Sequence, residues 1–232
     1  MKKAILLHGF HKNAKDMKPL AKYLTELGYD CFTPNLPLTF HEFDYAASHL
    51  EDQINDLTRQ MAKGEKVHLI GHSTGGLVIR KFLAITNYLD RIDRSVLIAT
   101  PNKGCKLATI ASNVKGYTDI FKTVRSLHVN YINQINFTHD TTIEIGAIAG
   151  YRNNLLLGKL IDDVNDGRVE IDSVYLPELK DFLLLPYGHK EIHHRRQTAH
   201  WIHRFLKRGS FHIQKQKAIV NRNNIYFSEK YN

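Results

Sequence analysis

Val67-His68-Leu69-Ile70-Gly71-His72-Ser73-Thr74-Gly75-Gly76-Leu77-Val78 is the stretch of sequence that decides the fold. An apolar strand pattern ends at Gly71, and an apolar helical pattern follows after a very short turn. Ser73 has a glycine two residues before it and another two residues after it. In so tight a turn the central residue is strained, and side chains at the two glycine positions would collide. The stretch predicts a serine hydroxyl at the carboxyl end of a sheet, over a helix N-terminus.

A plain strand-to-helix turn, with glycines used only for packing, is the alternative for this stretch. It leaves the second flanking glycine, Gly75, and the next residue, Gly76, without a reason. We therefore interpret Ser73 as a catalytic nucleophile.

Apolar, β-branched runs alternate with helical patterns on both sides of this turn. Strands are predicted at 4–7, 29–33, 67–70, 95–99, 143–149 and 182–185, and helices at 14–28, 45–63, 74–86 and from the last strand to about 206. Strands separated by helices are typical of a parallel sheet covered on both faces. The sequence predicts an α/β protein, a three-layer α/β/α sandwich with a mostly parallel six-stranded sheet.

Two segments interrupt the alternation. Residues 101–142 form a long insertion, predicted to be helical, with apolar positions at Ile120, Phe121, Val124, Leu127 and Ile132. Because it leaves the carboxyl end of the fourth strand, we expect a small cap over the serine that shapes specificity, rather than an ordinary crossover helix on the sheet edge. Residues 209–232 form a basic tail after a 1–208 domain, with weak alternation at Ile213, Ile225 and Phe227. A small hairpin, a docked arm and a disordered end all remain open for it.

Composition excludes several classes of protein. The 232 residues are 43% hydrophobic and 24% charged, which is typical of a globular domain that needs no disulfide or metal to fold. No apolar run approaches the length of a membrane span. Cys31 and Cys105 lie far apart and indicate no disulfide framework, so a reducing, cytoplasmic location is expected.

The net charge of +9 is the one unusual value. Much of the excess lies in 190–230, so the tail is a candidate for contact with an anionic membrane surface. A solvated basic surface is the simpler interpretation. No nucleic-acid-binding motif accompanies the charge, so no nucleic-acid partner is expected.

Four motifs resemble those of the α/β-hydrolase superfamily, and within it of the lipase and esterase group. The first is the turn around Ser73, which resembles the nucleophile elbow. The others are His8-Gly9-Phe10, similar to the oxyanion loop; Thr100-Pro101-Asn102-Lys103-Gly104, similar to T-P-H-x-G with Asn102 in place of the usual His; and Asn165-Asp166-Gly167-Arg168-Val169, similar to the N-D-G-x-V that carries the acid in bacterial lipases. The resemblance covers residues 1–207 and implies a minimal hydrolase that starts at the strand before the oxyanion loop.

In that fold the acid and then the base follow the serine along the chain. The acid candidates are Asp162, Asp163, Asp166 and Asp172. Asp166 is favoured because it matches the lipase motif and precedes Gly167 in a turn, with Asp163 second. An Asx-turn alone would also explain an aspartate before a glycine.

The base is expected directly after the last strand, where His189 lies in a loop that also contains Pro186 and Gly188. His193 and His194 are its competitors, but they are predicted to lie one turn into the following helix. The backbone amides of Phe10 and Thr74 are the predicted oxyanion donors. His8 is predicted to hold the loop by a side-chain hydrogen bond.

Neither a metal nor a cofactor is expected to take part. His189 and His193 are spaced to share a helix face, but Glu191 does not fit H-E-x-x-H, so only incidental metal affinity is expected. No Rossmann fingerprint or Walker loop is present in the sequence.

The resemblance and the candidate residues together predict hydrolysis of a small-molecule or lipid carboxylic ester through an acyl-enzyme. The same residues could cleave thioesters or amides, because leaving-group preference depends on pocket shape. A non-catalytic binding protein on a hydrolase scaffold is the alternative from another class. The oligomeric state stays open.

Overall fold

A computed structural model describes residues 1–135, 137, 142–212, 220–221 and 224–225. Its centre is a six-stranded sheet in which every neighbouring pair is parallel. In sheet order the strands are β2 (Tyr29–Phe32), β1 (Lys2–Leu7), β3 (Val67–His72), β4 (Ile92–Ile98), β5 (Glu144–Gly150) and β6 (Asp181–Leu185). The predicted α/β architecture with a parallel six-stranded sheet is confirmed.

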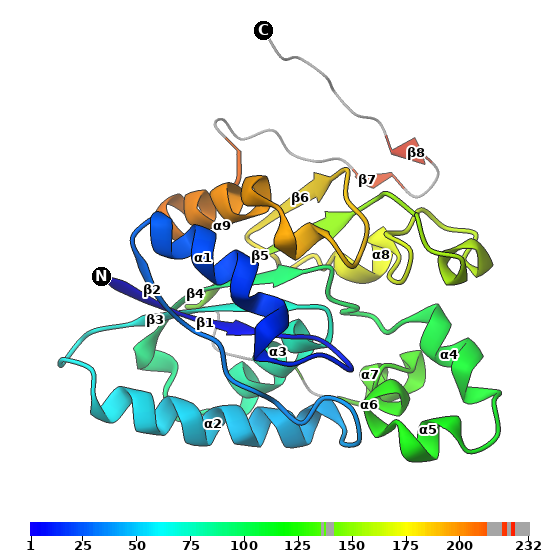
Figure 1. The fold of residues 1–232 in the computed structure, drawn as a ribbon, viewed down its shortest axis with the longest axis horizontal. Coiled ribbons are helices and arrows are strands. Elements are labelled where there is room, and N and C mark those ends of the chain that lie inside the picture. The colour runs from blue at the N-terminus through cyan, green and yellow to red at the C-terminus, as the bar shows by residue number, and fades with distance from the viewer. Residues whose placement is uncertain (136, 138–141, 213–219, 222–223, 226–232) are drawn as a thin grey trace, which may run out of the picture.

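Helices cover both faces of the sheet. Figure 1 shows α1 (Lys18–Glu26) and α9 (Arg196–Arg208) on one side and α2 (Phe43–Arg59) on the other, where α3 (Thr74–Ile85) packs beside α2. Strand β1 shows why both faces need cover: Ala4 and Leu6 face α1 and α9, while Ile5 and Leu7 face the α2 side. Side chains alternate across a strand, so an apolar run places hydrophobic groups on both faces.

The order of the strands determines where a site can form. After β1 the chain passes to β2 on one side of the sheet, and after β3 it passes to β4 on the other. In open α/β sheets, ligands bind at the carboxyl ends of the two strands where the direction reverses. Here those strands are β1, followed by His8-Gly9-Phe10, and β3, followed by Ser73.

The insertion after β4 is helical, as predicted, but it consists of short pieces. They are α4 (Lys106–Ser112), α5 (Tyr117–Ile120), α6 (Lys122–Ser126) and α7 (Val129–Gln134). Of its apolar positions, Val124, Leu127 and Ile132 are buried. Ile120 is 59% exposed at the end of the four-residue α5. Its neighbour Phe121 turns inward instead, and its ring lies about 6 Å from those of Phe10 and Phe40.

Four 3₁₀ turns and one short helix complete the described elements. They are η1 (Ala14–Met17), η2 (Leu89–Arg91), η3 (Leu157–Leu160), α8 (Ile171–Val174) and η4 (Ile192–His194). The predicted helix from residue 14 therefore begins as a 3₁₀ turn. His193 and His194 lie in η4, before α9 begins, and not within the helix as predicted.

The segment after α9 starts on the body of the domain. Gly209 ends α9 in a left-handed conformation (φ 69°), and Phe211 is fully buried against Phe205. The Phe211 amide and the Ser210 hydroxyl both donate to Asp181 at 2.7 Å. Further on, β7 (Val220–Asn221) and β8 (Asn224–Ile225) form an antiparallel pair. The predicted positions Ile213 and Phe227, and most of the tail predicted to meet a membrane, lie outside the described residues. No helix in the described ranges has the length and apolarity to cross a membrane.

Candidate active site

Ser73 lies in a strained turn between β3 and α3. Its backbone adopts φ 54° and ψ −126°, a conformation that an L-residue other than glycine rarely adopts. A Cβ atom on Gly71 would lie 2.6 Å from the backbone of Gly75 and Gly76. One on Gly75 would lie 2.6 Å from the carbonyl oxygens of Leu7 and His8. The collisions expected from the sequence are therefore present in the structure, and the turn closes only with glycine at both positions.

The loop after β1 lies directly against this turn. A Cβ atom on Gly9 would lie 2.9 Å from the Cβ atom of Ser73. The next amide, that of Phe10, has no hydrogen-bond acceptor among the described residues. Thr74 is the first residue of α3, where helix N–H groups lack acceptors within the helix. Both predicted oxyanion amides therefore belong to residues adjoining the Gly9–Ser73 contact.

His8 holds this loop in place. Its Nε2 accepts a hydrogen bond from the Leu36 amide at 3.0 Å, and its Nδ1–H donates to the Gly9 carbonyl at 3.0 Å. Burial lowers the pKa of His8, so the ring is neutral and can accept at Nε2. This is the side-chain role predicted for His8.

Ser73, His189 and Asp166 form one chain of hydrogen bonds. The Ser73 Oγ lies 3.1 Å from His189 Nε2, and His189 Nδ1 lies 2.8 Å from Asp166 Oδ2. Since a carboxylate only accepts, Nδ1 carries the ring proton and Nε2 is free to accept from the serine. His189 and Asp166 are almost fully buried, and Ser73 is 9% exposed. Ser73 directly follows β3, Asp166 lies in the segment between β5 and α8, and His189 lies in the loop after β6.

Asp166 is held by its own loop as well. Its Oδ1 accepts from the amides of Arg168 and Val169 at 3.0 and 2.9 Å, so the Asx-turn and the contact with His189 coexist. The competing acid Asp163 is exposed and pairs with Lys106. The sequence motif thus separates a buried aspartate from an exposed one three residues away.

His72 was not singled out from the sequence, yet it contacts the loop of His189. Its Nε2–H donates to the His189 carbonyl oxygen at 3.0 Å, and its ring stacks on that of His193 with centroids 3.7 Å apart. Burial lowers the pKa of His72 well below its usual value and lowers the pKa of His193 to about 4, so both rings are neutral near pH 7. His193 and His194, the competitors for the base, both hydrogen-bond to Asp16.

Asn102, where the resembling motif has histidine, serves the scaffold. Its Nδ2 donates to the Val174 carbonyl at 2.7 Å, and its backbone carbonyl accepts from Arg80 at 3.1 Å. These contacts join the start of the insertion to α8 and α3. None of them involves Ser73, His189 or Asp166.

The arrangement supplies the parts that nucleophilic acyl transfer needs. A hydroxyl faces a neutral imidazole, a carboxylate fixes the tautomer of that imidazole, and two backbone amides adjoin the hydroxyl.

Comparison with known proteins supports the same fold. The family described as alpha/beta hydrolase fold matches residues 5–115. No curated protein matches the chain in sequence. Among solved structures, the mature lipase BlEst2 of Bacillus licheniformis is similar, with a TM-score of 0.78, 20% identity, and 88% of this chain and 91% of that chain covered.

Two further structures widen the comparison. The metagenomic carboxyl esterase MGS0156 superposes with a TM-score of 0.72 at 12% identity, over 90% of this chain and 76% of its own. Phospholipase PlaB from Legionella pneumophila gives 0.67 at 17% identity, over 90% of this chain and 60% of its own. The chain therefore has the α/β-hydrolase fold.

Proposed function

We propose that the protein is a serine hydrolase that cleaves carboxylic esters through an acyl-enzyme. The observation that carries the proposal is the chain of hydrogen bonds from Ser73 Oγ to His189 Nε2 and from His189 Nδ1 to Asp166. A serine hydroxyl becomes nucleophilic only when a positioned base takes its proton, and the base acts only in the correct tautomer.

In this mechanism Ser73 Oγ attacks the ester carbonyl carbon while His189 Nε2 takes the hydroxyl proton. The negative charge on the carbonyl oxygen is stabilised by the Phe10 and Thr74 amides and by the N-terminus of α3. His189 then protonates the leaving alcohol, and the acyl group remains on Ser73. A water molecule that gives its proton to His189 hydrolyses the acyl-enzyme and restores the serine.

An apolar acyl group is the substrate class that the surroundings favour. The segment that leads from β5 to Asp166 exposes Leu156, Leu157 and Leu160, and η3 in this segment contacts α4 of the insertion. We assign the insertion the role of a small cap, because Phe121 packs against Phe10 of the oxyanion loop. The similar structures carry the names lipase, carboxyl esterase and phospholipase, which fits small-molecule or lipid esters.

The test is hydrolysis of p-nitrophenyl esters from acetyl to long acyl chains by the wild type and Ser73→Ala. We expect the variant to lose activity by about four orders of magnitude or more while it keeps its unfolding temperature. An Asp163→Asn variant is the matched control and should remain active, whereas Asp166→Asn should not. Activity retained by Ser73→Ala would contradict the mechanism.

A fluorophosphonate probe separates the remaining alternatives. A protein that is labelled at Ser73 but turns over no ester would be assigned to thioesters or amides. A protein that neither turns over esters nor reacts with the probe would be a binding protein on this fold.

A further inference from the structure

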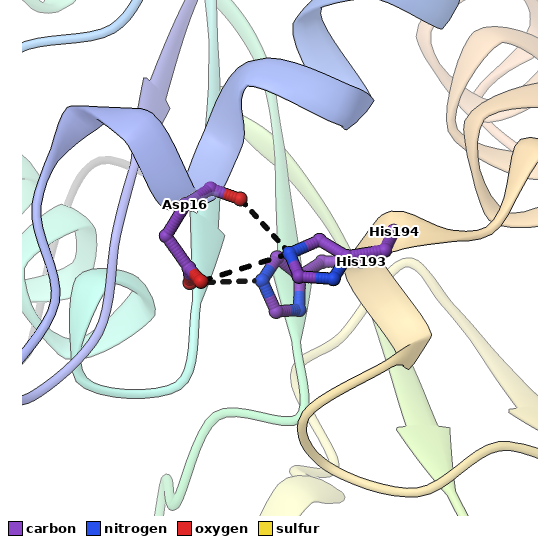
Figure 2. A group of neighbouring side chains, drawn as sticks. All are labelled: Asp16, His193 and His194. Atoms are coloured by element: carbon purple, nitrogen blue, oxygen red, sulfur yellow. Dashed lines mark hydrogen bonds and ion pairs between the residues drawn. The ribbon is translucent and has the colours of Figure 1, made fainter.

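Asp16, His193 and His194 meet in a cluster outside the proposed catalytic residues (Figure 2). Asp16 comes from η1, shortly after the oxyanion loop, and the two histidines come from η4, shortly after His189. Asp16 lies 177 residues from His193 and 178 residues from His194 along the chain. The cluster therefore joins the two loops that carry opposite sides of the candidate active site.

The spacing of the polar atoms in this cluster is that of metal ligands. Asp16 Oδ2 lies 2.9 Å from His193 Nε2, and Asp16 Oδ1 lies 3.6 Å from His194 Nε2. The Asp16 carbonyl oxygen lies 3.0 Å from His194 Nε2. Zn²⁺ takes nitrogen and oxygen ligands at about 2.0–2.2 Å, which separates neighbouring ligands of a tetrahedron by about 3.4 Å. The two separations between Asp16 and the histidines bracket that value, and the donor atoms of all three residues lie within 4.8 Å of one another.

The chemistry of the donors agrees with this geometry. Asp16 Oδ2 accepts a hydrogen bond from His193 Nε2, and His194 Nε2 lies beside Asp16 Oδ1, so one carboxylate and two imidazole nitrogens already face one another. Two imidazole nitrogens with one carboxylate oxygen are a donor set that suits Zn²⁺.

Three groups must rearrange when an ion binds. His193 Nε2 now donates to Asp16, so its proton must move to Nδ1, which is buried and has no partner among the described residues. His194 Nε2 now donates to the Asp16 carbonyl oxygen, so its proton must move to Nδ1 as well. Lys12 Nζ lies 3.1 Å from Asp16 Oδ1 and must turn away. The Lys12 side chain is 43% exposed, so it can reach solvent. His194 is partly exposed and opens the cluster to solvent on that side.

We propose that Asp16, His193 and His194 form a binding site for a divalent transition metal ion, best suited to Zn²⁺, with water as the fourth ligand. The ion ties the segment after the oxyanion loop to the segment after His189. Its proposed role is to hold these two segments together, and it does not depend on the ester-hydrolase proposal. His72, which stacks on His193 and binds the His189 carbonyl, connects the site to the base.

The experiment uses the full chain after dialysis against a chelator and then titrates ZnCl₂ by calorimetry and by thermal unfolding. The wild type should bind one equivalent and unfold at a higher temperature with Zn²⁺. His194→Ala removes a partly exposed ligand and should weaken binding by about 10- to 100-fold. His200→Ala removes an exposed histidine of α9 and should bind as the wild type does. Asp16→Asn should behave as His194→Ala does.

Three results would overturn the proposal. The first is no Zn²⁺ binding by the wild type, with a loss of metal-free stability in His194→Ala, which would make the cluster a hydrogen-bonded brace only. The second is equal binding by the wild type and His194→Ala. The third is equal weakening by His194→Ala and His200→Ala, which would show scattered binding by surface histidines.

Discussion

The turn around Ser73 and the segments around it are built in opposite ways. From Val67 to Gly76 every residue is buried, and the contacts that define the turn are between backbone atoms. In 101–135 and 151–164 the elements are short, and apolar side chains stay exposed at Ile110, Val114, Ile120, Leu156, Leu157, Leu160 and Val164. Close backbone contacts permit one residue type at each position, whereas an exposed apolar surface requires only hydrophobicity. The turn around Ser73, which carries the proposed chemistry, therefore tolerates few substitutions. The segments 101–135 and 151–164, which carry the proposed substrate contact, tolerate many.

The largest loss of stability should follow from a substitution in the turn around Ser73. Gly71→Ala places a methyl group 2.6 Å from backbone atoms of Gly75 and Gly76, and backbone atoms cannot move aside as a flexible side chain can. We expect unfolding to become easier by about 3 kcal/mol or more, or no folded protein at all. Gly64→Ala is the control, since Gly64 has positive φ but open space around it, and should cost about 1–2 kcal/mol. Urea unfolding compares the two, and equal losses would refute the contrast.

The difference between the turn around Ser73 and the exposed apolar segments explains which features could be predicted from the sequence. The glycines at 71 and 75 are visible in the sequence because the physical requirement acts on the residues themselves. The aspartate was separable from its neighbours because Asp166 precedes a glycine that adopts positive φ (97°). Strands β1, β3 and β5 were predictable because they are buried over most of their length and are therefore largely apolar.

The parts that could not be predicted depend on contacts between distant segments. Nothing local marks Asp16 as a partner of His193, since 177 residues separate them. His72 occupies a variable position of the motif, and its role depends on the η4 turn. Ile120 and Phe121 are both apolar, and only the packing of Phe121 on Phe10 decides which one turns inward.

Acid should destabilise the turn around Ser73, because the buried histidines His68 and His72 lie in Val67–Gly76 and the buried His193 stacks on His72. Burial lowers the pKa of His68 and of His193 to about 4, and the pKa of His72 lies well below the usual 6.5. Between pH 6.5 and about 4 the unfolded chain binds protons that the folded chain does not, so stability present above pH 6.5 is lost as the pH falls. Each histidine contributes about 1.4 kcal/mol per pH unit in this window.

Urea unfolding at pH 5 and pH 7 measures this loss. His68→Gln should reduce the difference in the free energy of unfolding between pH 5 and pH 7, because it removes one of the three buried histidines. His200→Gln, at an exposed position of α9, should leave the difference as it is in the wild type. Stability that does not depend on pH between 5 and 7 would show that these rings are not held neutral by the fold.

A smaller effect is expected from the contact between His72 and the His189 backbone. His72→Phe keeps a ring to stack on His193 but removes the N–H that donates to the His189 carbonyl. If the protein is an ester hydrolase, kcat should fall by about tenfold, the cost of one buried hydrogen bond, with KM little changed. His72→Gln restores an N–H donor and should recover part of the rate. A fall in KM and kcat together, or no change, would count against a positioning role.

The smallest effect on stability should come from substitutions in the exposed apolar segment 151–164. Leu156→Ser with Leu157→Ser replaces two exposed side chains, so the free energy of unfolding should change by about 0.5 kcal/mol or less. If these leucines contact an acyl chain, KM for a long-chain p-nitrophenyl ester should rise by about 3- to 10-fold while KM for the acetyl ester stays the same.

Phe32→Ser is the matched control, because Phe32 is an exposed apolar residue of β2, at the opposite edge of the sheet. Equal changes in KM for both variants would mean that general surface hydrophobicity matters, and not this segment. A change in KM confined to the Leu156 and Leu157 variant would show that the segment carrying Asp166 also contacts the acyl chain. Substitutions in segment 151–164 could then change substrate preference without disturbing the backbone contacts that hold Ser73. The two parts of the molecule are stabilised by different kinds of contact.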